Sequence, residues 1–398
     1  MTDSPLDALT LADLRRRTSV KWRAHPDDVL PLFVAEMDVP QAPFVVEAIT
    51  RALRAGDTGY DIGTTYAAAL APFAQRRWGW TPDERTSRTL PDVMVAVVEI
   101  LRVLTAPGDA VVVTPPVYPP FYGFTRNEGR QVVEAPLDDA GRLDLGTLEA
   151  AFRTATRTGG HGAGAGSGRR AVLLLCSPHN PTGTVHTRDE LEAVLALADR
   201  YGVRVVVDEI HAPFTFADLV PDGGTPFTPL LSVAGSERAI AIHSASKAFN
   251  LAGLRAATAV GGPDAADDLR RIPEEAGHGV NHLAVLAHAA AYAEGDAWLD
   301  ALRAGLVRNR ELATRLLAEH APRVRVHPAE ATYLMWLDVR AAVPEGADPH
   351  HHVLRHARVA LGDGRHFGSG GQGRLRLNLA TSPEILTEAV ERLGRALG

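Results

Sequence analysis

Apolar residues recur at helical spacing in several parts of the chain. Val45, Ile49 and Leu53, for example, fall on one face of a helix. The spacing predicts helices over residues 39–57, 91–109, 187–202 and 301–320. Thr187 and Glu190 have the spacing of a capping box, which predicts where one of these helices begins.

Short runs that are apolar throughout lie between and after these helices. They predict strands within residues 110–116, 170–183, 203–211, 239–247, 332–339 and 374–380. From about residue 90 to 260 such strands alternate with helices, which is typical of a mostly parallel sheet that is covered on both faces. The last third of the chain, where helices come before strands, predicts a smaller α+β unit.

Polar residues follow four of the predicted strands directly. They are Tyr118, Asn180, Asp208, and the group Ser244, Ser246 and Lys247. In open α/β sheets the ligand crevice lies at the carboxyl ends of the strands. We therefore expect these side chains to meet at one rim of the sheet.

These residue types are suited to one kind of chemistry. A lysine in a partly dry site can lose its proton and form an imine with an aldehyde. A buried carboxylate needs a cation, which a protonated pyridine nitrogen would supply. Serines, an arginine and a helix N-terminus can hold a phosphate dianion, and an aromatic ring can cover a heteroaromatic ring. Together they describe a site for pyridoxal 5′-phosphate (PLP).

The composition narrows the class of protein. The 398 residues are 45% hydrophobic and 22% charged, and the net charge of −7 argues against a nucleic-acid surface. The single cysteine, Cys176, lies in an apolar run and is expected to be buried. We find no signal peptide and no apolar run long enough for a membrane helix, so we expect a soluble cytoplasmic protein.

Two unusual segments carry no further function at this point. The glycine-rich run 159–168 is expected to be a flexible surface loop. Residues 349–353 include three consecutive histidines. Adjacent residues on one segment rarely converge on one ion, so we predict no metal site.

Several motifs resemble one enzyme superfamily in their sequence and order. SPHNPTG (177–183), VVVDEIH (205–211), SASKAFNLAGLR (244–255) and LRLNLA (375–380) are similar to the fold-type-I, class I/II aminotransferases. The segments LPLFVAEMDVP (30–40), DEIH (208–211) and TYLMWLD (332–338) resemble more narrowly the MalY/PatB cystathionine β-lyase branch.

The resemblance, which spans residues 18–395, implies a fold and a domain division. It implies an α/β protein whose large domain has three layers with a mostly parallel sheet, plus a smaller α+β domain. An N-terminal segment (1–45) would pack with the small domain and active site. The large PLP-binding domain would span residues 46–285, and the C-terminal small domain residues 286–398.

The same resemblance implies roles for the residues at the strand ends. Lys247 would bind the cofactor aldehyde and act as general base. Asp208 would pair with the pyridinium nitrogen, and Asn180 would hydrogen-bond the phenolic oxygen. His211 would lie near that same oxygen, and Tyr118 would stack on the ring.

The phosphate would be held by side chains and by a helix N-terminus. Ser244, Ser246 and Arg255 match the phosphate-binding side chains, and Val93 and Met94 would contribute backbone amides. Tyr60 matches a tyrosine that reaches the phosphate of a neighbouring subunit, which implies a homodimer.

On the substrate side, Arg376 matches the arginine that binds the α-carboxylate, and Glu36 and Met37 belong to the adjoining segment. Arg374 is a competitor for the role of Arg376, because it lies on the same face of the strand. Glu36 and Asp38 are equally well explained as solvated charges.

Other residues keep simpler alternatives. Tyr118 and Tyr60 can be packing aromatics, and His211 can be a structural histidine. The chain also departs from the lyase pattern at a few positions. Asp92 replaces a glycine near the phosphate, although it is also suited to cap the helix. The remaining departures, Phe33, Glu36, Val39 and Pro213, lie nearer the substrate.

Two activities fit these residues. The first is a carbon–sulfur β-lyase that cleaves cystathionine or cysteine S-conjugates to a thiol, pyruvate and ammonia. The second is an aminotransferase that passes an amino group to a 2-oxo acid. A non-catalytic regulator with the same fold is a third hypothesis, against which the intact Lys247 argues.

Overall fold

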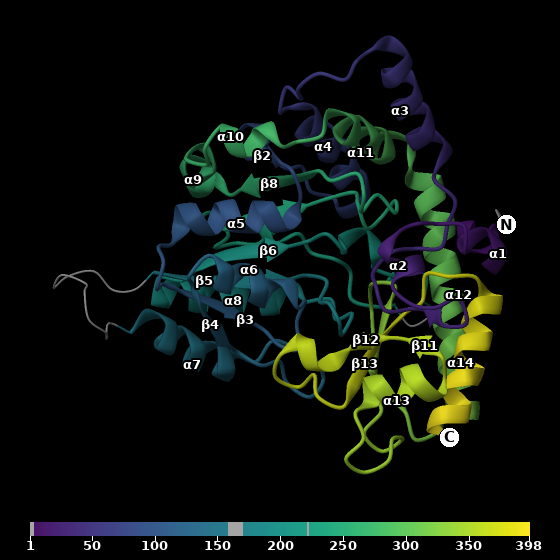
Figure 1. The fold of residues 1–398 in the computed structure, drawn as a ribbon. Coiled ribbons are helices and arrows are strands. Elements are labelled where there is room, and N and C mark those ends of the chain that lie inside the picture. Colours follow the sequence, from purple (N-terminus) through teal and green to yellow (C-terminus); the bar gives the residue numbers. More distant parts are fainter. Residues whose placement is uncertain (1–3, 158–169, 221–222) are drawn as a thin grey trace.

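A seven-stranded sheet forms the centre of the computed structural model, which describes residues 4–157, 170–220 and 223–398 (Figure 1). The order across the sheet is β2–β8–β7–β6–β5–β3–β4. Its strands are β2 (Ser87–Leu90), β3 (Ala110–Val113), β4 (Gln131–Glu134), β5 (Ala171–Cys176), β6 (Arg204–Asp208), β7 (Ile240–His243) and β8 (Ala257–Gly261). The five neighbouring strands β4, β3, β5, β6 and β7 are parallel. Strand β8 runs antiparallel to both of its neighbours, β7 and β2.

Side chains of the parallel strands alternate between two apolar layers. Val111 and Val113 of β3 pack in a cluster with α5 (Val93–Leu104), whereas Ala110 and Val112 pack in a cluster with α7 (Leu145–Thr156) and α8 (Arg188–Tyr201). Both faces of the sheet are therefore buried, which explains why the strands read as continuous apolar runs. The predicted three-layer α/β fold with a mostly parallel sheet is confirmed.

The helices of this part include those predicted within residues 39–57, 91–109 and 187–202, and several that were not predicted. They are α3 (Pro43–Ala55), α4 (Thr65–Trp78), α5 (Val93–Leu104), α6 (Pro120–Asn127), α7 (Leu145–Thr156), α8 (Arg188–Tyr201), α9 (Ala266–Arg270), α10 (Glu275–His278) and α11 (His282–Glu294). Gly56 ends α3 in the left-handed region, with φ 71°. The capping box of Thr187 and Glu190 is present at the start of α8.

A second, antiparallel sheet lies in the C-terminal part of the chain. Its order is β12–β13–β10–β9. The elements here are α12 (Asp296–His320), β9 (Arg325–Val326), β10 (Leu334–Asp338), α13 (Pro349–His356), β11 (Val359–Ala360), β12 (Gly362–Asp363), β13 (Arg374–Asn378) and α14 (Pro383–Leu397). This α+β unit has its own apolar core, formed largely by α12, α14 and the sheet.

The N-terminal segment joins this C-terminal unit, as Figure 1 shows. It contains α1 (Leu11–Leu14), α2 (Val20–Arg23) and β1 (Leu30–Pro31), and β1 pairs in parallel with β11. The domain limits at 45/46 and 285/286 stay a prediction, and the second of them falls inside α11. The glycine-rich run 159–168 lies outside the described residues.

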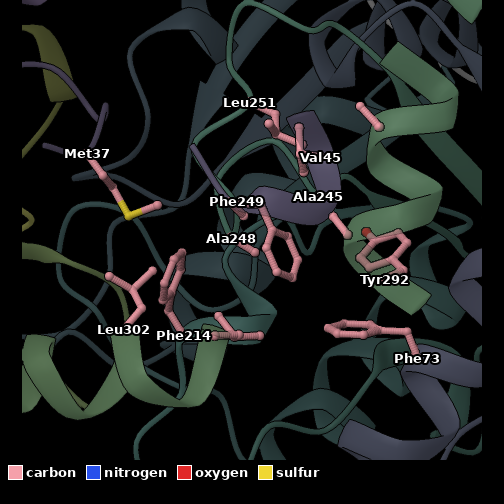
Figure 2. Packing of buried hydrophobic residues seen from close by; sticks show 14 of the residues in the cluster. Met37, Val45, Phe73, Phe214, Ala245, Ala248, Phe249, Leu251, Tyr292 and Leu302 are labelled. Atoms are coloured by element: carbon pink, nitrogen blue, oxygen red, sulfur yellow. The ribbon is translucent and has the colours of Figure 1, made fainter. Parts of the chain in front are cut away.

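The segment that follows β7 is fixed by its own apolar side chains. Ala245, Ala248, Phe249 and Leu251 are all at most 1% exposed and belong to one core cluster (Figure 2). Phe249 also stacks on Trp298, with ring centroids 5.7 Å apart. Because its neighbours are packed in this way, the backbone at Lys247 is held rigidly at the sheet rim.

A buried ion pair fixes the segment between β1 and α3. Lys21 Nζ lies 2.8 Å from Asp38 Oδ2, and both side chains are 0% exposed. Trp22 Nε1 donates a 3.1 Å hydrogen bond to Asp38 Oδ1. The interpretation of Asp38 as a solvated charge is therefore wrong: a buried lysine compensates its charge.

Two kinds of feature are absent from the described residues. No helix in the described ranges combines the length and the apolar character needed to cross a membrane. Among the same residues, no group of three or more histidine, cysteine, aspartate or glutamate side chains is placed to hold a metal ion.

We predict that Asp38→Ala lowers the free energy of unfolding by about 3–5 kcal/mol, because it leaves the Lys21 ammonium buried without its partner. Urea unfolding followed by circular dichroism measures the change. Arg270→Ala, which breaks the exposed pair of Arg270 with Asp267, is the control and should cost less than about 1 kcal/mol. Equal effects of the two substitutions would contradict the importance of the buried pair.

Candidate active site

The carboxyl ends of the central strands bring several of the predicted site residues to one rim. Cys176 of β5 pairs with Asp208 of β6, which in turn pairs with Ile242 of β7. The chain continues from these strand ends to Asn180 and to Lys247. The predicted convergence at the sheet rim follows from this register.

Lys247 lies in a site that disfavours its charge. Its Nζ donates a 2.9 Å hydrogen bond to the carbonyl oxygen of Ala35. Burial and the Arg376 cation lower the pKa of Lys247 to about 8, against the opposing effects of Asp208 and Glu36. A substantial fraction of the amine is therefore neutral near physiological pH, as a nucleophile or base requires.

The chain has only one other lysine, Lys21, in the buried pair with Asp38. Of the 41 lysine and arginine residues, all others are arginines. Since arginine does not form an imine with an aldehyde under ordinary conditions, Lys247 is the one lysine side chain at the rim suited to that reaction.

Asp208 is a buried carboxylate that faces the same space. One of its oxygens accepts a 3.0 Å hydrogen bond from the amide of Ile210. Burial raises the pKa of Asp208 to about 6, although that amide and the nearby Lys247 both favour the ionised form. A cation next to this carboxylate would compensate its charge.

Arg376 joins the small antiparallel sheet to the rim. Its Nη1 donates a 3.0 Å hydrogen bond to Asn180 Oδ1, and its Nη2 donates one of 3.0 Å to the carbonyl oxygen of Phe33. Burial lowers the pKa of Arg376 to about 10. Arg374 instead lies opposite Asp338 in the strand register. Of the two competing arginines, the structure thus places Arg376 against Asn180.

His211 and Tyr118 lie beside this group. His211 is 2% exposed, and its ring lies edge-on to Tyr333 at 5.8 Å. Burial, together with Lys247 and Arg376, lowers the pKa of His211 to about 3, so the ring is neutral. For Tyr118, burial and the Asp208 charge raise the phenol pKa. Both aromatic residues are therefore close enough to the charged groups of the rim for those charges to shift their pKa values.

The predicted phosphate residues lie between β7 and the start of α5. Ser244 Oγ lies 3.0 Å from Ser246 Oγ and donates a 2.7 Å hydrogen bond to the carbonyl oxygen of Ala256. Val93 and Met94 form the first turn of α5, where backbone amides have no partners within the helix. Asp92 caps this helix, as one of its two interpretations predicted.

Sequence reasoning missed the residues that hold the segment 33–39 over the rim. Tyr333 donates a 3.2 Å hydrogen bond to the Ala35 carbonyl, the same oxygen that Lys247 contacts. Asn250, with φ 56°, accepts from the Met37 amide at 2.8 Å and donates to the Met37 carbonyl at 2.9 Å. An asparagine shortly after the lysine was a usable signal, because asparagine tolerates this backbone conformation better than most residues.

The remaining predicted residues lie in different surroundings. Glu36 is half-buried and accepts a 2.6 Å hydrogen bond from Ser19, so it is not fully solvated. The Met37 side chain is 0% exposed and packs in the core, near Phe214 and Leu302 in Figure 2. Tyr60 is 91% exposed and lines a surface cleft of about 310 Å³ whose lining does not include Lys247. The roles of all three stay predictions.

The donor set of the rim fits PLP. Within the described residues, His211 Nδ1 and Arg376 Nε are buried polar atoms without a hydrogen-bond partner. A bound polar ligand would supply hydrogen-bond partners for these two atoms. A partly neutral lysine, a buried carboxylate, an amide side chain and paired serine hydroxyls supply a partner for each polar group of this cofactor.

The whole chain is similar to one family. The family model described as aminotransferase class I and II matches residues 28–393, and the chain belongs to this family. The predicted superfamily is thus confirmed.

The names of individual relatives are more specific than the family description. A protein of Mycobacterium leprae (strain TN) named "Putative cystathionine beta-lyase" is 52% identical over 411 residues, which cover 100% of this chain and 99% of the relative. The cystathionine beta-lyase of Corynebacterium glutamicum is 34% identical and covers 97% of this chain and 99% of the relative. These names agree with the lyase branch that the sequence motifs indicated.

A solved structure supports the fold and the cofactor. Cystalysin from Treponema denticola, described as containing pyridoxal 5′-phosphate, superposes with a TM-score of 0.86 at 26% identity. The match covers 100% of this chain and 99% of cystalysin.

We predict that the reactivity of Lys247 toward an aldehyde follows its lowered pKa. In cofactor-free protein, the rate of pyridoxal attachment should rise roughly tenfold per pH unit below pH 8 and level off above it, because only the neutral amine reacts. Borohydride trapping at a series of pH values, with peptide mass spectrometry to assign the site, measures this. A rate that keeps rising to pH 10, as for an ordinary lysine, would show that the site does not lower the pKa.

Proposed function

We propose that this protein is a PLP-dependent carbon–sulfur β-lyase that acts on cystathionine or related cysteine S-conjugates. The observation that carries the proposal is Lys247, with its lowered pKa, placed beside Asp208 and Arg376 at the sheet rim. The cystathionine beta-lyases among the relatives, which match this chain over nearly its full length, favour the lyase outcome.

The cofactor would be held by the groups already described. Lys247 would bond to the aldehyde carbon, and Asp208 would hold a proton on the ring nitrogen through its negative charge. Asn180 would donate to the phenolic oxygen, with the neutral His211 close by. Tyr118 would cover one face of the ring. When bound, PLP supplies an electron sink for the pair released at the substrate α-carbon.

The substrate would be oriented by Arg376 and deprotonated by Lys247. The Arg376 guanidinium has the fork geometry that binds a carboxylate through two hydrogen bonds, and its Nε is free for one of them in the described structure. Lys247 then takes the α-proton, for which a pKa of about 8 is well matched to neutral pH. The carbonyl oxygen of Ala35 accepts a hydrogen bond from the lysine amine and keeps it in place.

The overall reaction balances with one water molecule. The Cα–H and Cβ–S bonds break, and the sulfur leaves with its electron pair and gains a proton to give the thiol. Water takes the place of the amino group at the α-carbon. The remaining three carbons are then released as pyruvate, and the nitrogen is released as ammonia. No external oxidant or reductant is required.

An aminotransferase is the second candidate. The family model that matches the chain carries that description, and both reactions need the same lysine, carboxylate and arginine. The two reactions separate only after the α-proton has been removed, where a lyase expels a group from Cβ. An amino-group acceptor is therefore part of the assay below.

We propose further that two copies of the chain associate, with Tyr60 completing the phosphate site of the partner. Tyr60 and Ile62, at 91% and 79%, are the most exposed large hydrophobic side chains of the described residues, and a partner chain would cover them. We place the enzyme in the cytoplasm, since its sole cysteine is buried and unpaired, as is ordinary for a protein of a reducing compartment.

We predict that purified protein with PLP converts L-cystathionine to pyruvate and a thiol in equal amounts. Lactate dehydrogenase coupling measures pyruvate, and a thiol reagent measures the second product. Lys247→Ala should lower kcat by at least roughly a thousandfold, because both the attachment point and the base are lost. Formation of a 2-oxo acid that retains the sulfur, dependent on an added amino acceptor and without release of thiol, would establish the aminotransferase instead.

We predict that two inactive variants restore each other in a mixed dimer. Tyr60→Ala should bind PLP weakly, and Lys247→Ala should be inactive. When they are mixed and re-associated at limiting PLP, the hybrid holds one site with an intact Lys247 and the intact Tyr60 of the other chain. Roughly a quarter of wild-type activity should return, because half of the dimers are hybrids with one complete site each. Activity that does not rise above the sum of the two variants would contradict a shared site.

A further inference from the structure

Asp92 makes two contacts at the predicted phosphate site. As the N-cap of α5, its Oδ1 accepts a 2.8 Å hydrogen bond from the amide of Val95. Its Oδ2 forms an ion pair with Arg255. The Asp92 carboxylate thus accepts a hydrogen bond from the helix N-terminus and forms an ion pair with Arg255 at the same time.

Within the described structure, the Arg255 side chain forms its ion pair with this carboxylate. The Arg255 side chain is 63% exposed, whereas that of Asp92 is 18% exposed. The aspartate is held by the helix cap, so Arg255 is the member of the pair that can move. Because the arginine is exposed, exchanging its partner costs little packing.

The charge of Asp92 opposes that of a phosphate in the same place. A helix N-terminus and an arginine favour an anion, and here both already interact with one. A phosphate dianion has to draw Arg255 away from Asp92 or share it, and it meets the negative carboxylate as it does so. The glycine of the lyase pattern at this position would present neither obstacle.

We propose that Asp92 is an affinity-determining residue of the cofactor site, which competes with the cofactor phosphate for Arg255 and so weakens retention of PLP. This inference rests on the proposed function, since it assumes that PLP binds at Lys247. Asp92 acts on the phosphate group alone among the parts of the cofactor, whereas its hydrogen bond at the N-cap of α5 serves folding. PLP therefore dissociates from this enzyme faster than it would from the same site without the charge of Asp92.

The test is the variant Asp92→Asn. Asparagine keeps the N-cap hydrogen bond but removes the charge, so α5 is preserved. We expect the Kd for PLP, measured by titration of cofactor-free protein, to fall roughly tenfold, the order of magnitude of one or two charge contacts in water. In about 0.5 M salt, where screening is strong, the gain should shrink to roughly twofold.

Pyridoxal, which lacks the phosphate, separates the charge effect from a general change of the site. Its affinity should be equal in wild type and Asp92→Asn. Inorganic phosphate should compete with PLP more effectively in the variant. Asp144→Asn makes the same exchange at the N-cap of α7, where Asp144 accepts from the Gly146 amide at 2.7 Å, and should leave PLP affinity unchanged.

The outcomes distinguish this inference from the proposed function. If wild type binds PLP at Lys247 but Asp92→Asn binds it equally or more weakly while retaining its thermal stability, the inference is overturned and the function stands. The same holds if the variant gains equally for pyridoxal. If wild type forms no borohydride-trapped adduct at Lys247 with excess PLP, the proposed function and this inference both fall.

Discussion

The site depends on keeping the amine of Lys247 partly dry. Burial and the nearby Arg376 cation disfavour its charge, which leaves a nucleophile and base near neutral pH. That arrangement is costly unless the backbone is rigid, because a free lysine would extend into water. The apolar side chains of Ala245, Ala248 and Phe249, buried on either side of it, supply this rigidity.

The segment between β1 and α3 closes the site from the other side. Its Ala35 carbonyl accepts hydrogen bonds from both Lys247 and Tyr333. The Asn250 side chain forms hydrogen bonds with both the amide and the carbonyl of Met37. Asn378 adds hydrogen bonds to the carbonyls of Val34 and Glu36, 2.8 and 2.7 Å long. A segment with almost no regular structure is thereby fixed through its polar backbone groups, which would otherwise be buried unpaired.

Local patterns were sufficient for many of the elements and for the choice of candidate cofactor residues. Strands β3, β5, β6 and β7 are buried on both faces, so continuous apolar runs predicted them, and the capping box at Thr187 placed the start of α8 correctly. Strands β2, β4 and β8 were not predicted. Asn180, Asp208 and Lys247 were identifiable as candidates because each lies at the carboxyl end of such a strand or within a few residues after it. The alternatives for Asp38 could not be resolved locally, since its partner Lys21 lies 17 positions earlier in the sequence and in a different element.

The sequence by itself determined the order of the elements, the strand ends that carry polar groups and the chemical types available there. Periodicity and residue type are local properties, so they can be seen without a fold. Only the tertiary structure decided that Arg376 rather than Arg374 contacts Asn180, that Tyr60 lies exposed, and that Asp92 pairs with Arg255. These facts depend on strand register and on contacts between residues more than 100 positions apart, which no local pattern encodes.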